Sequence, residues 1–567
     1  MSLHTYIVRT TADAIGLGTL RSAITYANAH PGTTITFAGN LAHQTIALNA
    51  DLPLLDGNFT INGGANHITI SGAGQHRIFF ADSGHITIEN LMLADGFARG
   101  GDGGTGQEGN SGGGGMGAGG ALFVRGSLGG HAVANVTLVN VGFSADAAHG
   151  GNGGADTFPF ASEGATGGGG GLGGNGGSNQ SFVEGAGGGG AFPGENGGDA
   201  TSTGGSTGGG PNGGARGTPG QPGGDFSGGG GASGFGVSGG SGGFGGGGGG
   251  SVDSVGGSGG FGGGGGGDVG ASGGTGGFGG GGGGGVNATA TGGFGGGNGG
   301  AALGLANGGG GGAGMGGAVF VMQGAGLTIV GKSLFAGDSV QGGNAGAGGT
   351  DGQAFGGGMF LEGNGTLRFS PGLGQTEHVF SAIDDEAGVM ASAPGSYRLI
   401  KSGLGALVLS ADNGYSGGTI LKAGTLEVST QFAAGVGPAD IGVITFGGSA
   451  TLKIDNAALS DLFDHTFAIQ INSFGRHDVL DLTGLHFHHG ATARYDAATE
   501  DLFVRSGVLT YDLSLQSPLG RHFAVANDGH GGTKVTLALP HAAAVVSQSG
   551  QHLDGSAHHL GDYLWVG

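Results

Sequence analysis

The chain of 567 residues contains no cysteine, so neither a disulfide nor a thiolate metal site can contribute to its fold. A protein without cysteine could also cross a cell envelope unfolded without redox side reactions. Lys and Arg together number 17 against 39 Asp and Glu, which gives a formal net charge of −22. We therefore expect neither nucleic acid nor an anionic membrane surface as a partner.

The sequence also lacks long hydrophobic runs. No stretch approaches about 18 uninterrupted apolar residues, so we expect no membrane insertion by this chain. A signal peptide consists of a basic segment followed by an apolar one, and the N-terminal residues do not show this pattern. Proline is scarce, with 12 in total, and glycine does not occupy every third position throughout, which excludes collagen.

Glycine, in contrast, accounts for 157 residues and is concentrated between 145 and 316. A unit recurs there: two glycines, Ser or Thr, two glycines, Phe and a glycine run. The phenylalanines Phe244, Phe261, Phe278 and Phe294 are spaced by 17, 17 and 16 residues. This regular spacing argues against the flexible linker that a Gly/Ser composition ordinarily indicates.

The larger side chains of each unit fall three residues apart. They form the pairs Ser241/Phe244, Ser258/Phe261 and Thr275/Phe278. A period of three is typical of a polyproline-II-type helix, which glycine adopts while letting neighbouring backbones approach closely. We predict ordered polyglycine-II-like runs, in which the phenylalanine row either locks the layer or docks a partner.

Outside the glycine-rich region, short apolar segments alternate with Gly, Asn and Asp turns, which predicts an all-β fold. One helix is expected over 19–30, with Thr19 as its N-cap and Pro31 after its end. Its shared apolar face consists of Leu20, Ala23, Ile24 and Ala27. A helix before the first coil would cap the open end of a solenoid, where backbone groups are otherwise unpaired.

Three segments follow one template, two glycines and then a short apolar strand. They are 119–124, 316–321 and 356–361, and glycine-rich sequence precedes each of them, over 96–118, 145–315 and 339–356. We interpret them as successive coils of one solenoid. The three glycine excursions are then predicted to leave and re-enter at the same corner and to lie side by side on one flank.

Several segments resemble bacterial surface proteins. Residues 18–28 look like the opening of right-handed β-helix surface proteins. The Gly-Gly-Ala strands and the Phe-x-x-Asp elements are similar to repeats of polymorphic outer-membrane proteins, although Asp146 and Asp338 stand where that family carries Asn. The glycine layer resembles the polyglycine-II bundles of an antifreeze protein and of phage tail-tip adhesins.

Residues 399–428 resemble the passenger-associated repeat of autotransporters. A coil begins at Lys401-Ser-Gly, the strand 406–409 follows, and Asn413-Gly414 makes a turn. This resemblance implies a secreted passenger whose repeat assists export and folding. It also implies an extracellular or cell-surface location.

Together these patterns predict a right-handed parallel β-helix with an N-terminal capping helix, polyglycine-II-like insertions and an all-β C-terminal region. The expected domains are 1–144 with the cap and first coils, 145–315 with the glycine insertion, 316–430 with the continued β-helix, and 431–567 with the C-terminal module.

Candidate catalytic and metal-binding groups are few. Paired carboxylates such as Asp51/Asp56 or Asp384/Asp385/Glu386 can hydrolyse glycosides, but their turn-like surroundings favour solvated turn residues. A metal could be held by His486, His488 and His489 with Asp478 or Asp481, although plain surface histidines are the simpler interpretation. We predict no enzymatic activity and no cofactor.

The function predicted from these observations is a secreted or surface-displayed structural adhesin, a rigid rod that binds multivalently. Its expected partners are a host or neighbouring-cell surface and a polysaccharide or protein receptor, with possible self-association. Three alternatives stay open: a self-assembling filament or biofilm-matrix subunit, a polysaccharide-cleaving β-helix enzyme, and an ice-binding protein.

Overall fold

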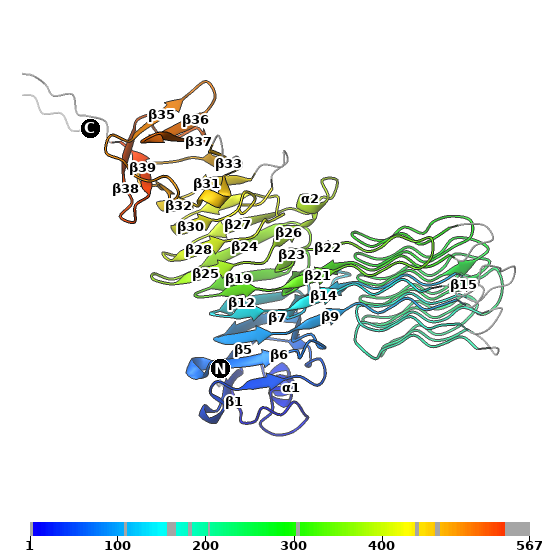
Figure 1. Cartoon of the computed structure of the whole chain (residues 1–567). Helices are drawn as coiled ribbons and strands as arrows, with labels where there is room; N and C mark the ends of the chain where they lie inside the picture. Colours follow the sequence, from blue (N-terminus) through cyan, green and yellow to red (C-terminus); the bar gives the residue numbers. More distant parts are fainter. Residues whose placement is uncertain are drawn as a thin grey trace, which may run out of the picture.

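The computed structural model describes residues 4–106, 110–155, 166–179, 184–201, 205–301, 307–436, 442–459 and 465–538. The protein is nearly all β and has two parts (Figure 1). Long ladders of parallel strands form a column, and the described residues of the glycine-rich segments 100–118, 150–315 and 342–355 form a slab on one side of it. We call these parts the column and the glycine slab.

The column consists of three ladders in which each strand pairs in parallel with strands of the coils before and after it. The first ladder contains β1 (Thr5–Val8), β2 (Thr34–Phe37), β5 (Phe59–Asn62), β7 (Phe79–Glu89), β12 (Ala134–Val139), β19 (Gly326–Val330), β24 (Gly365–Ser370), β27 (Tyr397–Lys401), β29 (Thr419–Leu421), β31 (Val443–Phe446), β33 (Thr466–Asn472) and β37 (Leu509–Gln516). The second contains β3 (Thr45–Ala47), β6 (Ile68–Ser71), β8 (Leu91–Ala94), β13 (Gly142–Ser144), β20 (Leu334–Ala336), β25 (Thr376–Val379), β28 (Ala406–Leu409), β30 (Gly424–Val428), β32 (Ala450–Ile454) and β34 (Val479–Leu482). The third contains β4 (Leu55–Asp56), the first part of β7, β11 (Leu122–Val124), β18 (Val319–Val321), β23 (Met359–Leu361) and β26 (Ile383–Asp385).

The register of the ladders places similar residues of successive coils directly above one another. Ile86 pairs with Val136, which pairs with Leu327, and all three side chains are buried. The alternation of buried and half-buried residues in β12 directs every second side chain inward. The resulting continuous apolar core and the parallel ladders are compatible with a β-helix.

The end of the described chain is antiparallel. It contains β35 (Thr492–Asp496), which pairs with β36 (Asp501–Ser506), and β36 also pairs with β37. A second antiparallel pair consists of β38 (Phe523–Asn527) and β39 (Thr533–Leu537). The second ladder runs into this region without a break, because β32 pairs with β34 and β34 with β39. The column therefore continues across residue 430.

The predicted helix is present as α1 (Leu20–Ala29), at the N-terminal end of the column beside β1 (Figure 1). The hydroxyl of its N-cap Thr19 accepts a hydrogen bond from the Ser22 N–H. Its buried residues are Leu20, Ala23, Ile24 and Ala27, the apolar face expected from the sequence. The other short helices are α2 (Glu386–Val389) and the 3-10 turns Gly39–Leu41, Gly64–Asn66 and Asn456–Ala458. No helix in the described ranges is long and apolar enough to span a membrane.

Asparagines order one corner of the column. Asn90 and Asn140 adopt left-handed backbone conformations, with φ of 54° and 53°, which asparagine tolerates better than most residues. The Asn140 amide donates to Asn90 Oδ1 at 2.9 Å, and the Asn90 amide donates to Asn62 Oδ1 at 3.0 Å. This ladder of side chains holds successive coils in register.

The Phe-x-x-Asp corner uses carboxylates instead. Asp146 is fully buried and accepts the Gly96 N–H at 2.7 Å, while Asp338 accepts the Asp146 N–H at 3.1 Å. Burial raises the pKa of Asp146 well above its ordinary value and that of Asp338 to about 7. Each aspartate therefore connects one coil to the coil before it.

The glycine slab is held together by hydrogen bonds between separate runs. Within one run, Gly112, Gly113 and Gly114 donate to three different runs, at Gly104, Gly265 and Gly310. The same cycle repeats at Gly115, Met116 and Gly117, which donate to Gly101, Gly262 and Ala313. Partners thus recur every third residue, the period that the sequence predicted.

Close packing of the runs explains why they are glycine. A Cβ atom at Gly113 would lie 2.1 Å from the carbonyl oxygen of Gly281, and one at Gly264 would lie 2.1 Å from that of Gly113. Both distances are far below van der Waals contact. A side chain at either position would push two runs apart.

All three glycine excursions leave and re-enter the column at one corner, as predicted. The exit strands β9 (Phe97–Arg99), β14 (Ala147–His149) and β21 (Ser339–Gln341) pair side by side. The return strands β10 (Gly117–Ala118), β17 (Gly314–Met315) and β22 (Ala354–Phe355) do the same. Within the slab, β15 (Ser251–Val252) pairs with β16 (Asp268–Val269) far from the column (Figure 1).

Candidate functional site at the junction of column and slab

The four phenylalanines of the repeat lie at turns on the column side of the slab. A glycine with positive φ follows each of them, for example Gly262 at 78° and Gly279 at 75°. Consecutive rings are stacked, with centroids 5.4 Å apart for Phe244 and Phe261, 5.2 Å for Phe261 and Phe278, and 5.1 Å for Phe278 and Phe294. The predicted register of this row is therefore present.

A second row of phenylalanines on the column faces the first. These residues are Phe80, Phe123, Phe320 and Phe360, the outward-facing members of the third ladder, which pair in register. The Phe320 ring lies 6.2 Å from Phe261 and 6.4 Å from Phe278, with the rings inclined edge to face. The repeat phenylalanines are thus packed between slab and column.

The hydroxyl residues of the repeat lie on the opposite side of the turns. Ser241 and Thr275 are exposed, Ser258 is half-buried, and the Thr275 hydroxyl donates to Ser258 Oγ at 3.2 Å. They form a row of hydroxyl groups on the outer face of the slab.

Arg125 joins slab to column by charge. Its Nη1 lies 2.8 Å from Asp82 Oδ1 on the column, and its Nη2 lies 2.7 Å from Asp225 Oδ1 on the slab. The guanidinium also lies over the Phe244 ring, 4.0 Å from the centroid, in cation–π geometry. The Arg125 side chain is 2% exposed.

Sequence inspection missed Arg125, although a signal was present. The residues that directly follow the three template strands are Arg125, Met322 and Glu362, so one coil carries a cation where the others do not. In a chain with 17 basic residues, such a break in a repeat marks a position with its own role.

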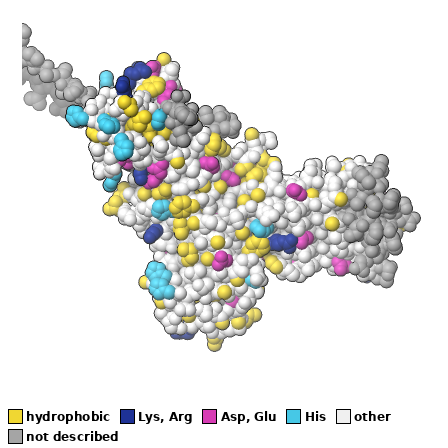
Figure 2. Space-filling model, viewed as in Figure 1, with side chains coloured by type: hydrophobic (Ala, Val, Ile, Leu, Met, Phe, Trp, Pro, Cys, Tyr) yellow, Lys and Arg dark blue, Asp and Glu magenta, His cyan; other side chains and the backbone are white. Residues whose placement is uncertain are grey.

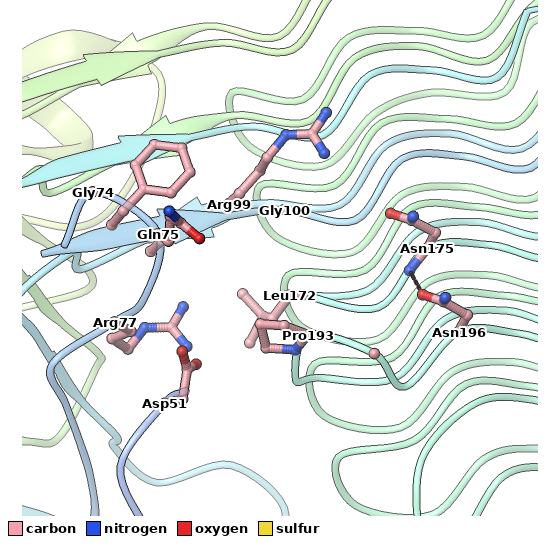
Figure 3. Close-up of a pocket in the computed structure, with 14 residues that line it drawn as sticks. Asp51, Gly74, Gln75, Arg77, Arg99, Gly100, Leu172, Asn175, Pro193 and Asn196 are labelled. Atoms are coloured by element: carbon pink, nitrogen blue, oxygen red, sulfur yellow. Dashed lines mark hydrogen bonds between the residues drawn. The ribbon is translucent and has the colours of Figure 1, made fainter. Parts of the chain in front are cut away.

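A groove lies beside this junction, between the first coils of the column and one edge of the slab. One hollow of about 400 Å³ is lined from the column by Asp51, Arg77, Phe97 and Arg99, and from the slab by Leu172, Asn175, Pro193 and Asn196 (Figure 3). A second hollow of about 510 Å³ shares Asp51 and Pro193 with it and adds His76 and Glu195. We call the two together the junction groove. Figure 2 shows basic and acidic side chains where the slab meets the column.

Arg77 is held firmly in the wall of this groove. It is 4% exposed, its Nη2 donates to Ala118 O at 3.1 Å, and its Nε donates to Gly119 O at 3.2 Å. Burial lowers the pKa of Arg77, and the charge of Asp51 opposes that effect. Figure 3 shows the guanidinium beside the Asp51 carboxylate and directed toward the slab.

The acidic cluster Asp384, Asp385 and Glu386 is not solvated, so that expectation was wrong. Asp385 and Glu386 are buried and Asp384 is half-buried, at the junction of β26 and α2. Asp385 Oδ2 accepts the N–H groups of Tyr397 and Ser416, each at 2.7 Å. Burial raises the pKa of all three carboxyls. The coils around them supply backbone N–H donors that the local sequence does not reveal.

The other candidate groups are dispersed. Asp51 lines the junction groove, whereas Asp56 accepts a hydrogen bond from the Ser83 hydroxyl. Asp478 accepts the N–H groups of Ala450 at 3.2 Å and Gly475 at 2.7 Å. Among the residues placed by the structure, no three His, Asp or Glu side chains are grouped so that they could hold a metal ion. His486, His488 and His489 are therefore not part of such a group.

Residues 397–428 form four strands, β27 to β30, in two successive levels of the column. Lys401 is fully buried and donates to the carbonyls of Ser402, Gly403 and Ala423 at 2.8, 3.0 and 2.9 Å. Buried Tyr415 shares a 2.6 Å hydrogen bond with Thr419. These residues of the segment therefore stabilise its turns and strands.

The column and slab define an extended, nearly all-β protein built from parallel ladders. A family model described as passenger-associated-transport-repeat matches residues 399–428, the segment just described. This match supports an autotransporter passenger-type protein, and it implies secretion to the cell surface or the extracellular space. No curated protein and no solved structure matches the chain.

Proposed function

We propose that the chain is a structural adhesin in which a right-handed β-helix presents a polyglycine-II slab at the cell surface or in the extracellular space. Its receptor is a polysaccharide or protein on a host or neighbouring cell. The observation that carries the proposal is the fixed attachment of the slab through two facing phenylalanine rows and Arg125. A slab held in this way offers a rigid surface, which lowers the entropy lost on binding.

The finer structural assignments rest on particular contacts. The three-residue cycle of hydrogen bonds and the absence of room for a Cβ support polyglycine II. The position of α1 beside β1 supports its role as a cap that covers the first coil. Because the carboxylates of the acidic cluster accept backbone N–H groups, we also propose that the protein acts without catalysis.

Adhesion can be tested with beads coated with the full chain and applied to intact bacterial and host cells. Beads coated with an unrelated acidic β-rich protein of similar net charge serve as the control. We expect saturable retention that soluble full chain competes away. Retention equal to that of the control, or insensitive to the competitor, would contradict adhesion.

Self-assembly into filaments is a second candidate, favoured by the exposed row of hydroxyls from Ser241 to Thr275 on the slab face. A regular face of this kind can contact the same face of another copy. Light scattering over a range of protein concentrations tests it, and a chain that stays monomeric at high concentration would rule it out.

A further inference from the structure

We propose that the junction groove binds a carboxylate-bearing saccharide, a segment of uronic-acid residues. This inference rests on the proposed adhesive function and names the chemical class of the receptor. Four features of the groove support it: a fixed guanidinium, a buried carboxylate oxygen, apolar residues in its walls and its size.

The first feature is a fixed guanidinium in an acidic molecule. The chain has 17 basic residues and a net charge of −22, yet Arg77 and Arg99 both line one hollow, together with Asp51. Arg99 is paired with Asp102 at 2.8 Å and Glu195 lines the second hollow, so Arg77 is the cation that a ligand would meet. Arg77 uses Nε and Nη2 for carbonyl oxygens, and its Nη1 has no hydrogen bond within the described part of the chain. A guanidinium fixed on one side presents its remaining N–H groups to an incoming carboxylate.

The second feature is a buried carboxylate oxygen. Asp51 Oδ1 accepts no hydrogen bond from any residue that the structure places, and its ion-pair partner is His76, whose Nδ1 lies 3.4 Å away. A buried acceptor without a hydrogen bond is destabilising, so a hydroxyl donor at this position is favoured. Arg77 and Asp51 together suit the carboxylate and hydroxyl groups of one uronic-acid residue.

The third feature is the mixture of apolar and amide groups on the walls. The exposed Pro193 and the half-buried Phe97 supply apolar surface for the C–H faces of sugar rings. Asn175 and Asn196 are exposed on the slab side, where their amides can reach further hydroxyls. Apolar surface beside a few placed polar groups is common in small-ligand sites.

The fourth feature is size. Each hollow, at about 400 and 510 Å³, falls within the size range of ligand pockets. The two share Asp51 and Pro193, so they adjoin each other. Two adjoining hollows suit neighbouring sugars of one oligosaccharide.

Calorimetric titration of the full chain tests the proposal with three probes: an oligogalacturonate, an uncharged oligosaccharide of equal length, and inorganic sulfate. We expect the oligogalacturonate to bind, with an affinity that falls as salt rises because charges are paired. Neither other probe should bind comparably. Equal binding of the uncharged oligosaccharide, equal binding of sulfate, or no binding of oligogalacturonate would each overturn the assignment.

Three substitutions locate the site. Arg99→Gln removes an exposed groove cation, and Arg77→Lys removes the planar fork while keeping the charge; each should weaken binding about tenfold or more. Arg368→Gln, at an exposed position of β24, makes the same charge change outside the groove and should leave affinity unchanged. Unchanged unfolding midpoints show that Arg99→Gln remains folded. If Arg368→Gln weakens binding as much as Arg99→Gln, the groove is not the site.

The bead assay separates this proposal from the adhesive function. Adhesion that persists undiminished in Arg99→Gln would refute the groove as the receptor site and leave adhesion itself standing. Oligogalacturonate binding without adhesion to any cell would refute adhesion and leave the groove assignment standing.

Discussion

At the scale of single residues, Arg125 shows how one side chain can determine the attachment of a large insertion. Two carboxylates from different parts of the molecule, Asp82 and Asp225, share its guanidinium. Its neighbour Phe244 belongs to the first stacked turn of the repeat. Loss of the cation therefore removes ionic and aromatic contacts together.

Replacing Arg125 by methionine is expected to destabilise the protein by about 3 kcal/mol. Removal of one partner leaves buried Asp82 without its cation, while Asp225, 43% exposed, is compensated by water. The loss of stability is measured by unfolding in denaturant, with cleavage by trypsin near Arg216 as the readout. Arg368→Met, at an exposed position, should change stability by no more than about 0.5 kcal/mol. Equal effects of the two substitutions would show that the junction does not depend on Arg125.

The sequence predicted which phenylalanines of the slab share a row, but not what they pack against. In the strand Leu122-Phe123-Val124 all three residues are buried, so no alternation shows that Phe123 points outward. Both faces of that strand are covered, one by the column core and the other by the slab. The residues that cover the second face lie about 120 residues further along the chain, in the glycine-rich repeat.

At the scale of elements, the phenylalanine row connects turns that would otherwise be separate. Phe261 lies between Phe244 and Phe278 at 5.4 and 5.2 Å and also contacts Phe320. The glycine runs carry few other apolar side chains, so this row supplies much of the apolar packing between slab and column.

Phe261→Ala should therefore destabilise the slab by about 3–5 kcal/mol, as for other buried Phe→Ala changes, whereas Phe261→Leu should cost less. Amide hydrogen exchange over residues 205–301 measures the effect, because the glycine N–H groups report directly on contacts between runs. Phe235→Ala is the matched control in the same region, since Phe235 is 55% exposed. Faster exchange in both variants to the same degree would contradict a locking role for Phe261.

Element types were easier to predict than their surroundings. The α1 cap residue and apolar face, the short strands and the common corner of the excursions all follow from local pattern. The burial of Asp384–Glu386 does not, because its compensating donors, such as Gly356, Tyr397 and Gly414, come from neighbouring turns and coils. The junction groove was missed for the same reason, since Arg77 and Asn175 meet only when slab and column are assembled.

At the scale of the whole molecule, buried carboxyls make stability depend on pH. Burial raises the pKa of Asp338 and Glu362 to about 7 and that of Glu377 to about 8, from ordinary values of 3.8 and 4.5. Below about pH 4 both the folded and the unfolded chain bind these protons, and the full contribution to stability is present. Between about pH 4 and 8 the folded chain alone retains them, so stability falls as pH rises.

We therefore expect the protein to unfold at lower denaturant concentration at pH 8 than at pH 5. Asp338→Asn should flatten this dependence, because it removes one group that loses its proton near pH 7. Asp412→Asn, at an exposed position, should leave the slope unchanged. Stability that rises from pH 5 to pH 8 would contradict the assignment. The measurement is a set of denaturant midpoints across this pH range.

The hydrogen bonds of the central glycine run constrain the order in which the molecule can form. The run from Gly112 to Gly117 lies among neighbours as distant in sequence as Gly262–Gly265 and Gly310–Ala313. Coils of the column before this level can pair as they follow one another along the chain, but the run stays incomplete until about 200 further residues are available. The next step of the column, the pairing of β12 with β19, spans the same excursion. The column therefore advances beyond this level only when the residues of the long glycine excursion are also available.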